Sequence, residues 1–363
     1  EIRAFVPQEY WTLEVTLDRV APNQGSFKTQ FYGREKKMEL KSQEDVDQVL
    51  AAIRTAPFSV SKIKRQDKNR APAPPFITST LQQEASPKLN MTPGILLAPG
   101  WSENALVSAG LQAKTSHING VFNCVCIVDI DSSTAGATKY DDVKRQKEKQ
   151  AVTSANCYAV WLYAKVGDVI YAGSAMAAAA TVATDANNGD IPNVSPDNKP
   201  ISISAACLKD GTEVLLDQEQ ANVVNSFGVA TWLNMNGFRL WGNNTACYPG
   251  NTDPKDRSFS VRRFFCWDDN TFIQTYFQKV SDPLNKRLIE ALVDSENVRG
   301  NSFVSRGICA RYELQYIESE NPTTDLLNGT VKFHKYMSPF NPAEDIEEIV
   351  EFDPNAISTA LAG

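Results

Sequence analysis

Two β-type runs in the middle of the chain constrain the fold most strongly. Residues 121–131 (VFNCVCIVDID) and 157–164 (CYAVWLYA) have the composition of buried strands. The predicted strands and helices alternate over residues 93–102, 103–116, 121–131, 141–154, 157–164 and 173–187. This order predicts βαβ units and a mostly parallel sheet, in which residues 141–154 form a charged, exposed helix.

The pattern changes in the next part of the chain. A helix is expected over Leu216–Phe227, and the run after it turns at Asn234–Gly237 like a hairpin. Two helices broken near Asp282-Pro283 are expected between Phe259 and about Leu292. The aromatic side chains of the first of these helices are expected to pack in a core; they are Phe264, Phe265, Trp267, Phe272, Tyr276 and Phe277.

The chain ends in three strand-like runs, Ile308–Ile317, Val331–Tyr336 and Ile346–Phe352. Helices followed by antiparallel strands are typical of α+β domains. The sequence therefore predicts an α+β protein, with a mixed α/β core over residues 94–235 and an antiparallel β/α domain over residues 236–363.

The first part of the chain predicts a small β-rich segment. Residues 10–19 alternate apolar and polar side chains, which indicates a half-buried strand. Ser42 and Asp45 have the spacing of a capping box at the start of a helix. A further strand is expected over Phe58–Lys64, before the proline-rich connector at residues 71–76. With few apolar contacts, such a segment has marginal stability by itself.

Charge and cysteine use both change near residue 90. Residues 1–92 carry 14 Lys and Arg against 11 Asp and Glu, a net charge of +3, whereas the remainder carries 22 against 32, a net charge of −10. All seven cysteines lie in the second part. This shift predicts a boundary between two unlike pieces, with a junction at residues 87–93.

No catalytic or cofactor site is expected. The chain has no glycine-rich phosphate loop and no G-x-S-x-G motif. Its two histidines are His117, expected in a turn, and His334, expected on a strand. The odd number and wide spacing of the cysteines favour reduced, buried thiols in a cytosolic protein. The predicted protein is therefore not an enzyme.

No metal site or membrane segment is expected either. The acidic runs at residues 129–131, 268–269 and 344–348 could bind Mg²⁺, but solvated faces or turns are the favoured interpretation. Cys124 and Cys126 alternate on a strand and point to opposite faces, which disfavours zinc. The longest apolar stretch is too short for a bilayer, and no secretory signal is present in the sequence.

One basic run is the candidate nucleic-acid contact. Its cations are Lys62, Lys64, Arg65, Lys68 and Arg70. Such a cluster can contact phosphates, but an exposed strand end followed by a linker explains it equally simply. The net charge of −7 makes nucleic acid a disfavoured partner.

Residues 1–86 resemble a stretch of bacterial type IA DNA topoisomerases. The blocks EIRAFVPQEYW (1–11) and APPFITSTLQQEAS (73–86) carry the resemblance. It implies a fragment of the gate domain. The family's tyrosine motif and its acidic metal-binding domain have no counterpart in this sequence, and Pro87 stands where an Arg is common. The resemblance therefore implies gate-like structure without strand-cleaving activity.

Residues 93–363 resemble the sheath proteins of contractile phage tails. The carrying blocks are GILLAPGWS, CIVDID, SAMAAAATVATDANNGDIPNVSP, GFRLWGNNTA, SFSVRRFFCWDDNTF and PAEDIEEIVEF, in the family's order. Asn244 stands where the family often has an Arg. The resemblance implies a structural protein of a phage or prophage virion tail. It would be assembled in the host cytoplasm from copies of itself, with a tail tube protein and a baseplate as further partners.

Sheath subunits exchange terminal strands, so the resemblance also implies a subunit contact at the C-terminus. The predicted contact residues are Ile346, Ile349, Val350 and Phe352. Added to a neighbour's sheet, this strand would bind through main-chain hydrogen bonds. The topoisomerase-like segment replaces the usual N-terminal arm, so we expect that half of the exchange to be lost or altered. A DNA-binding protein that uses the topoisomerase-like segment is the alternative.

Overall fold

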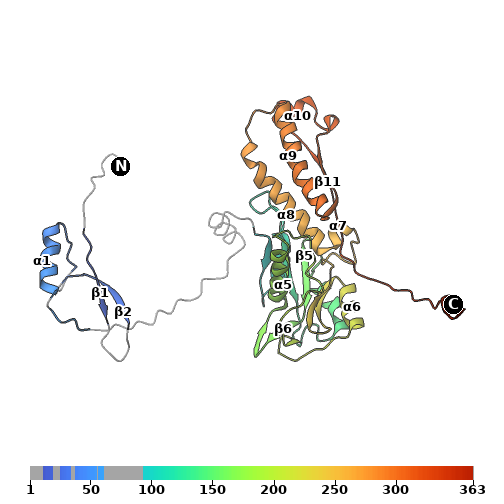
Figure 1. Cartoon of the computed structure of the whole chain (residues 1–363), viewed down its shortest axis with the longest axis horizontal. Coiled ribbons are helices and arrows are strands. Elements are labelled where there is room, and N and C mark those ends of the chain that lie inside the picture. The colour runs from blue at the N-terminus through green and yellow to red at the C-terminus, as the bar shows by residue number, and fades with distance from the viewer. Residues whose placement is uncertain (1–10, 19–24, 34–36, 55, 61–92, 363) are drawn as a thin grey trace. The chain divides into compact units, whose positions relative to one another are not determined.

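The computed structural model describes residues 11–18, 25–33, 37–54, 56–60 and 93–362. The chain divides into two compact units, Glu1–Ala73 and Pro74–Gly363, and each is described by itself (Figure 1). The junction predicted at residues 87–93 lies outside the described residues, apart from Pro93, and remains a prediction.

The first unit contains a hairpin and a helix. β1 (Glu14–Asp18) pairs antiparallel with β2 (Ser26–Gln30). α1 (Gln43–Ile53) begins at the predicted capping box, in which Ser42 and Asp45 each bond the other's main-chain N–H. These two predictions, a strand within residues 10–19 and a helix after Ser42, are confirmed.

The described part of the first unit buries few apolar side chains. Leu40 is the one buried hydrophobic side chain among its described residues, and α1 buries none of its own. The strand predicted at Phe58–Lys64 is wrong over residues 58–60, which have no regular structure; the rest of that run lies outside the described residues. The described residues of this unit therefore contribute little hydrophobic stabilisation.

Five strands form the central sheet of the second unit, in the order β10 (Phe238–Trp241), β9 (Val229–Asn234), β5 (Cys157–Trp161), β4 (Val125–Ile130) and β3 (Ile95–Leu97). The strands from β9 to β3 are parallel, and β10 is antiparallel at the edge. Every residue of β4 and β5 is buried, because parallel sheets have both faces covered. The predicted parallel sheet and the β9–β10 hairpin are confirmed.

Helices pack against this sheet (Figure 1). They are α3 (Ala105–Ala113), α4 (Val143–Lys149), α5 (Gly173–Asn187) and α6 (Gln218–Ser226), with a 3₁₀ turn, η2, at Tyr140–Asp142. The helix expected over residues 141–154 is shorter than predicted, and it is not simply exposed. Its Lys147 is buried, because the ammonium group donates to the carbonyl oxygens of Phe227 (2.5 Å) and Tyr248 (2.9 Å).

The strand predicted over residues 157–164 is two strands. Leu162 has a left-handed φ of 83° and separates β5 from β6 (Tyr163–Val166). β6 pairs with β7 (Val169–Tyr171) and β8 (Ala205–Cys207) in a small antiparallel sheet. α5 begins against this turn at Gly173, where a Cβ would lie 2.4 Å from the Leu162 carbonyl oxygen.

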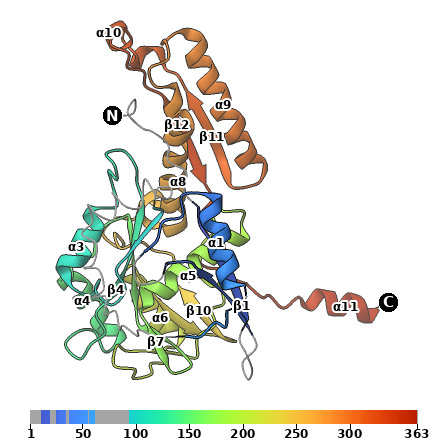
Figure 2. The same ribbon diagram turned by 90° about the vertical axis from the view of Figure 1, so that its left-hand side faces the viewer.

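A helical layer with its own two-stranded sheet follows the central sheet, as Figure 2 shows. Its elements are α7 (Pro254–Arg257), α8 (Phe259–Tyr276), η3 (Phe277–Lys279), α9 (Lys286–Ser305), β11 (Cys309–Gln315), η4 (Glu318–Glu320), α10 (Thr323–Leu327) and β12 (His334–Pro339). β11 and β12 are antiparallel. The predicted break between two helices near Asp282-Pro283 is confirmed.

This layer has a separate apolar core. Phe264, Phe303 and Tyr312 lie in it, and Trp267 packs against it. The predicted core role is therefore confirmed for Phe264 and Trp267. It is wrong for Phe277, which is exposed because α8 ends before it at the tip of the layer.

Candidate self-association surfaces

The C-terminal arm, residues 340–362, is the most exposed described part of the second unit (Figure 2). Every residue from 343 to 362 is exposed. The predicted contact residues Ile346, Ile349, Val350 and Phe352 are 88%, 85%, 81% and 77% exposed. Several large apolar side chains exposed to solvent on one segment indicate an interaction site.

The strand predicted over Ile346–Phe352 is wrong for the single chain. These residues have no strand pairing, because a strand needs a second strand for its main-chain bonds. After these residues, helix α11 (Pro354–Ala362) begins. The Asp353 carboxylate accepts a hydrogen bond from the N–H of Asn355 at 2.9 Å, and proline suits the first helical position.

The arm is anchored where it leaves the fold. Glu344 pairs with Arg257, at the end of α7. The Arg257 guanidinium also donates to Asn244 Oδ1 at 2.9 Å and lies 5.1 Å from the centre of the Tyr248 ring. Asn244 thus orients the cation that binds the root of the arm.

The outer edge of β11 is closed by a side chain. Asn297 of α9 accepts from the N–H of Leu314 (2.7 Å) through Oδ1 and donates to its carbonyl oxygen (3.0 Å) through Nδ2. Both outward main-chain groups of Leu314 are therefore satisfied without a third strand. A strand added beside β11 would have to displace this amide.

The outer edge of β12 is open. In the part of the chain that the structure describes, β12 pairs with β11 alone. Lys335 lies opposite Leu314, and Met337 lies opposite Tyr312. Since Leu314 directs its main-chain groups outward, alternation along the ladder gives Lys335 and Met337 the same orientation. β12 therefore presents a row of main-chain groups that an added strand can use.

A buried charge cluster holds β12 in position. Asp268 of α8 and Glu296 of α9 are fully buried. Lys335 Nζ lies 2.7 Å from Asp268 Oδ2 and 3.1 Å from Glu296 Oε1. Arg299 lies 2.6 Å and 2.5 Å from the same two carboxylates. The Tyr312 hydroxyl donates to this pair, so the cluster joins α8, α9, β11 and β12.

The Glu296 carboxylate of this cluster is ionised near neutral pH. Burial alone would raise the pKa of Glu296, but hydrogen bonds from Arg299 and Tyr312 and the charge of Lys335 outweigh it and lower the pKa to about 2. Burial raises the pKa of Tyr312, so its hydroxyl stays protonated and able to donate. Two carboxylates are thus paired with Arg299 and Lys335 inside the layer.

Other acidic groups are also used structurally. The favoured interpretation of the runs at residues 129–131 and 268–269 as solvated is wrong for Asp129 and Asp268, which are buried. Asp129 accepts from the Ser102 hydroxyl (2.8 Å) and from the Ser174 N–H (2.7 Å). Among the described residues, no group of three or more His, Cys, Asp or Glu side chains could hold a metal ion.

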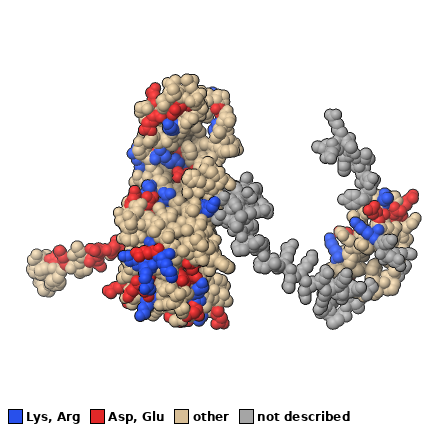
Figure 3. Space-filling view, turned by 180° about the vertical axis from the view of Figure 1, so that it is seen from behind, with Lys and Arg blue, Asp and Glu red and all other residues tan. Residues whose placement is uncertain are grey.

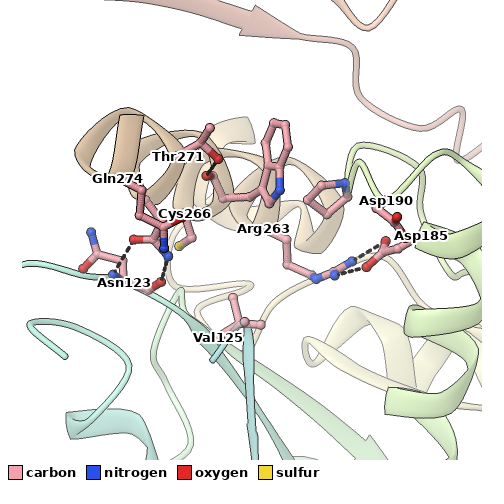
Figure 4. A pocket seen from close by; sticks show the side chains of 12 residues that line it. Asn123, Val125, Asp185, Asp190, Arg263, Cys266, Thr271 and Gln274 are labelled. Atoms are coloured by element: carbon pink, nitrogen blue, oxygen red, sulfur yellow. Dashed lines mark hydrogen bonds and ion pairs between the residues drawn. The ribbon is translucent and has the colours of Figure 1, made fainter. Parts of the chain in front are cut away.

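A cavity of about 310 Å³ between α8 and the sheet is lined by paired groups (Figure 4). Arg263 forms a two-contact ion pair with Asp185, the longer contact being 3.1 Å. Asn270 accepts from the Asn123 N–H (2.9 Å) and donates to its carbonyl oxygen (2.6 Å). These contacts hold α8 against the elements of the central sheet. The polar groups that line the cavity therefore have a structural role.

The cysteines and histidines have structural environments. Burial raises the pKa of the Cys124 and Cys266 thiols, which keeps them protonated and unreactive. His117 has a φ of 60° in a turn, as predicted, and His334 lies on β12 beside Glu320. Within the described ranges, no helix combines the length and apolar composition needed to cross a membrane.

The two parts of the chain are similar to different kinds of known protein. Residues 1–98 match the DNA topoisomerase family. A chain of the anti-feeding prophage baseplate is 18% identical and has a TM-score of 0.58, with 74% of this chain and 72% of that chain covered. The sheath complex of an extracellular contractile injection system in its contracted state is 18% identical, covers 77% and 76%, and has a TM-score of 0.60.

The helical sheath of the anti-feeding prophage in its contracted state is also similar. It is 19% identical, with 69% of this chain and 66% of that chain covered and a TM-score of 0.54. At these identities the likeness establishes the fold, so this chain has the fold of contractile sheath proteins. Both predicted resemblances, to a sheath protein and to a topoisomerase, are confirmed.

The candidate DNA contacts are the five cations of the basic run at residues 62–70. Lys62, Lys64, Arg65, Lys68 and Arg70 lie outside the described residues, as do most residues of the two topoisomerase-like blocks. They remain predictions. Sequence reasoning missed the open edge of β12 and the charge cluster behind it, because both depend on side chains that are distant in the sequence.

Proposed function

We propose that this chain is a structural subunit of a contractile tail sheath, which assembles with copies of itself rather than catalysing a reaction. The observation that carries the proposal is an arm of exposed apolar residues and an open sheet edge in one chain that has the sheath fold. The protein would form a tube around a tail tube in the tail of a phage or a phage-derived injection system, with a baseplate as a further partner. Assembly would take place in the host cytoplasm.

The arm has the face pattern of a strand that covers a core. With a period of two, Ile346, Val350 and Phe352 share one face with Glu348, and Glu347 and Glu351 lie on the other with Ile349. Such a strand would bury the three apolar side chains of its first face and leave the second face in water. Because a one-residue shift would exchange the two faces, this pattern also fixes the register.

The edge of β12 in a second copy is the acceptor we propose for this strand. Its outward main-chain groups at Lys335 and Met337 would pair with the arm. Behind it, Lys335 is held by Asp268 and Glu296, so the edge is presented in one orientation. The competing edge on β11 is closed by Asn297.

Two matched substitutions in the full chain test this assignment. Val350→Asp places a charge on the face that we expect to be buried, and Ile349→Asp places the same charge on the solvent face. We expect Val350→Asp to abolish self-association in sedimentation velocity, and Ile349→Asp to change it little. Equal effects, or a larger effect of Ile349→Asp, would contradict the proposed strand.

The topoisomerase-like first unit should change the kind of assembly that the protein forms. Because the topoisomerase-like segment stands where a sheath protein has its own N-terminal arm, we propose that only the C-terminal half of the strand exchange remains. Electron microscopy of the purified protein should then show short or irregular oligomers. Long regular tubes like those of an intact sheath would refute this part of the proposal.

The match of residues 1–98 to the DNA topoisomerase family supports a second candidate, a DNA-binding protein without strand-cleaving activity. The net charge of −7 disfavours this candidate, because proteins that bind nucleic acid usually carry a basic surface. A gel-shift assay at low salt, with the wild type and a variant in which the five cations from Lys62 to Arg70 are replaced by Gln, separates the two. Salt-sensitive binding that the replacements remove would favour the second candidate.

A further inference from the structure

A groove crosses the outer part of the helical layer. It has a volume of about 780 Å³ and lies between the first half of α9, the end of β11 and α10. Leu284, Ile289 and Val293 contribute apolar side chains from the α9 side, and Leu326 contributes one from α10. Its acidic lining residues are Glu290, Asp294, Glu313 and Glu318.

Helix α11 has the properties of a ligand for this groove. Ile357 and Leu361 are one turn apart, so they share a face, and they are 49% and 83% exposed. A helix of nine residues is not stable alone in water and needs a partner for its apolar face. Within the part of the chain that the structure describes, no residue covers this face, since every residue of α11 is exposed.

Charge distinguishes α11 from the rest of the arm. Residues 344–353 carry six acidic side chains and no cation. Four acidic side chains and one cation, Lys286, line the groove, so its net negative charge would repel them. Residues 354–362 (PNAISTALA) carry no charged side chain. Figure 3 shows this contrast along the projecting arm, which has acidic side chains near its root and none at its end.

The geometry of the proposed strand brings α11 to the groove. If the arm runs antiparallel to β12, its strand ends beside His334, where β12 begins. His334 lies opposite Gln315, and Gln315 lines the groove together with Tyr316. Neighbouring strands are about 4.8 Å apart, so α11 would begin roughly 10 Å from Gln315. One residue, Asp353, separates the strand from the helix.

We propose that the groove of one copy binds α11 of a second copy, and that the donated strand therefore runs antiparallel to β12. This inference rests on the proposed strand donation, and it adds a second, apolar contact to it. The strand would supply main-chain hydrogen bonds, and the helix would supply a pair of buried anchors. The direction of the arm on the neighbour follows from joining the two contacts.

A disulfide-trapping experiment on full-length chains tests the contact. A Val293→Cys chain and a Leu361→Cys chain are mixed, oxidised and analysed on a non-reducing gel. We expect a linked heterodimer, formed at least about tenfold more than in a mixture of Val298→Cys and Leu361→Cys. Val298 is a matched control, because it is exposed on another face of α9 and does not line the groove.

The outcomes separate this inference from the strand donation. No excess of heterodimer over the control overturns the groove assignment. A link that forms only within a double variant, Val293→Cys with Leu361→Cys in one chain, overturns it in favour of the chain's own arm. The effect of Val350→Asp on sedimentation is measured in parallel. If that effect persists without the cross-link, the strand donation stands alone, and if neither appears, both proposals fail.

Discussion

The charge cluster behind β12 gives the sharpest stability prediction. Lys335→Met removes one of two cations that balance Asp268 and Glu296, both fully buried. Arg299 remains, at 2.6 Å and 2.5 Å from the two carboxylates. The variant thus leaves a net charge of −1 inside the helical layer, while methionine roughly preserves the volume of the lysine stem.

The expected cost is large. Breaking a buried ion pair by removing one partner costs about 3–5 kcal/mol, because the other charge stays buried without compensation. Lys332→Met is the matched control. Lys332 pairs with Asp325 at 2.9 Å, but its side chain is 57% exposed, so that pair is worth about 0–1 kcal/mol. Both variants remove one lysine charge, but the side chain of Lys335 is 16% exposed and that of Lys332 is 57% exposed.

Urea unfolding followed by tryptophan fluorescence measures both variants. Of the six tryptophans, Trp267 packs against the core of this layer. We expect the midpoint of Lys335→Met to fall far below that of the wild type, and the midpoint of Lys332→Met to stay close to it. A Lys335→Met protein that loses no more free energy of unfolding than Lys332→Met would refute the role given to the cluster.

Three further predictions concern the same layer. The pKa of Glu296 is lowered from 4.5 to about 2, so its contribution to stability is full above about pH 4.5 and should disappear as the pH falls toward 2, measured by unfolding at a series of pH values. Gly300→Ala should cost about 1–3 kcal/mol, since its Cβ would lie 2.0 Å from Tyr312 Cδ1, whereas Gly110→Ala, with open space around it, should not destabilise. Asn297→Leu should lower the free energy of unfolding by about 1–3 kcal/mol in the same assay, because it leaves the main-chain groups of Leu314 unpaired. A neutral effect would mean that this amide does not close the edge of β11.

Local signals in the sequence predicted much of the fold. The pair Ser42 and Asp45 marked the start of α1, and the apolar runs marked β4 and β5, because capping and burial leave their traces in neighbouring residues. The break after Trp161 was not predictable in the same way. Leu162 takes a left-handed φ, which a leucine side chain does not predict. One run of β-type residues therefore forms two strands.

The candidate surfaces were predictable only in part. The apolar side chains of the arm showed at Ile346 and its neighbours, but their pairing partner is not in the same chain. Asp268 next to Asp269 looks like a solvated turn in the sequence. It is buried because Arg299 and Lys335 reach it from other elements. Long-range charge pairing of this kind has no period that a single sequence can reveal.

Sedimentation velocity over a range of protein concentrations, for the full chain and a chain that lacks residues 346–363, tests self-association most directly. We predict that the full chain forms larger species as its concentration rises. The shortened chain should remain monomeric with an unchanged circular dichroism spectrum for the sheet and the helical layer. Identical sedimentation of the two proteins would contradict the assignment of the C-terminal arm as the contact between copies.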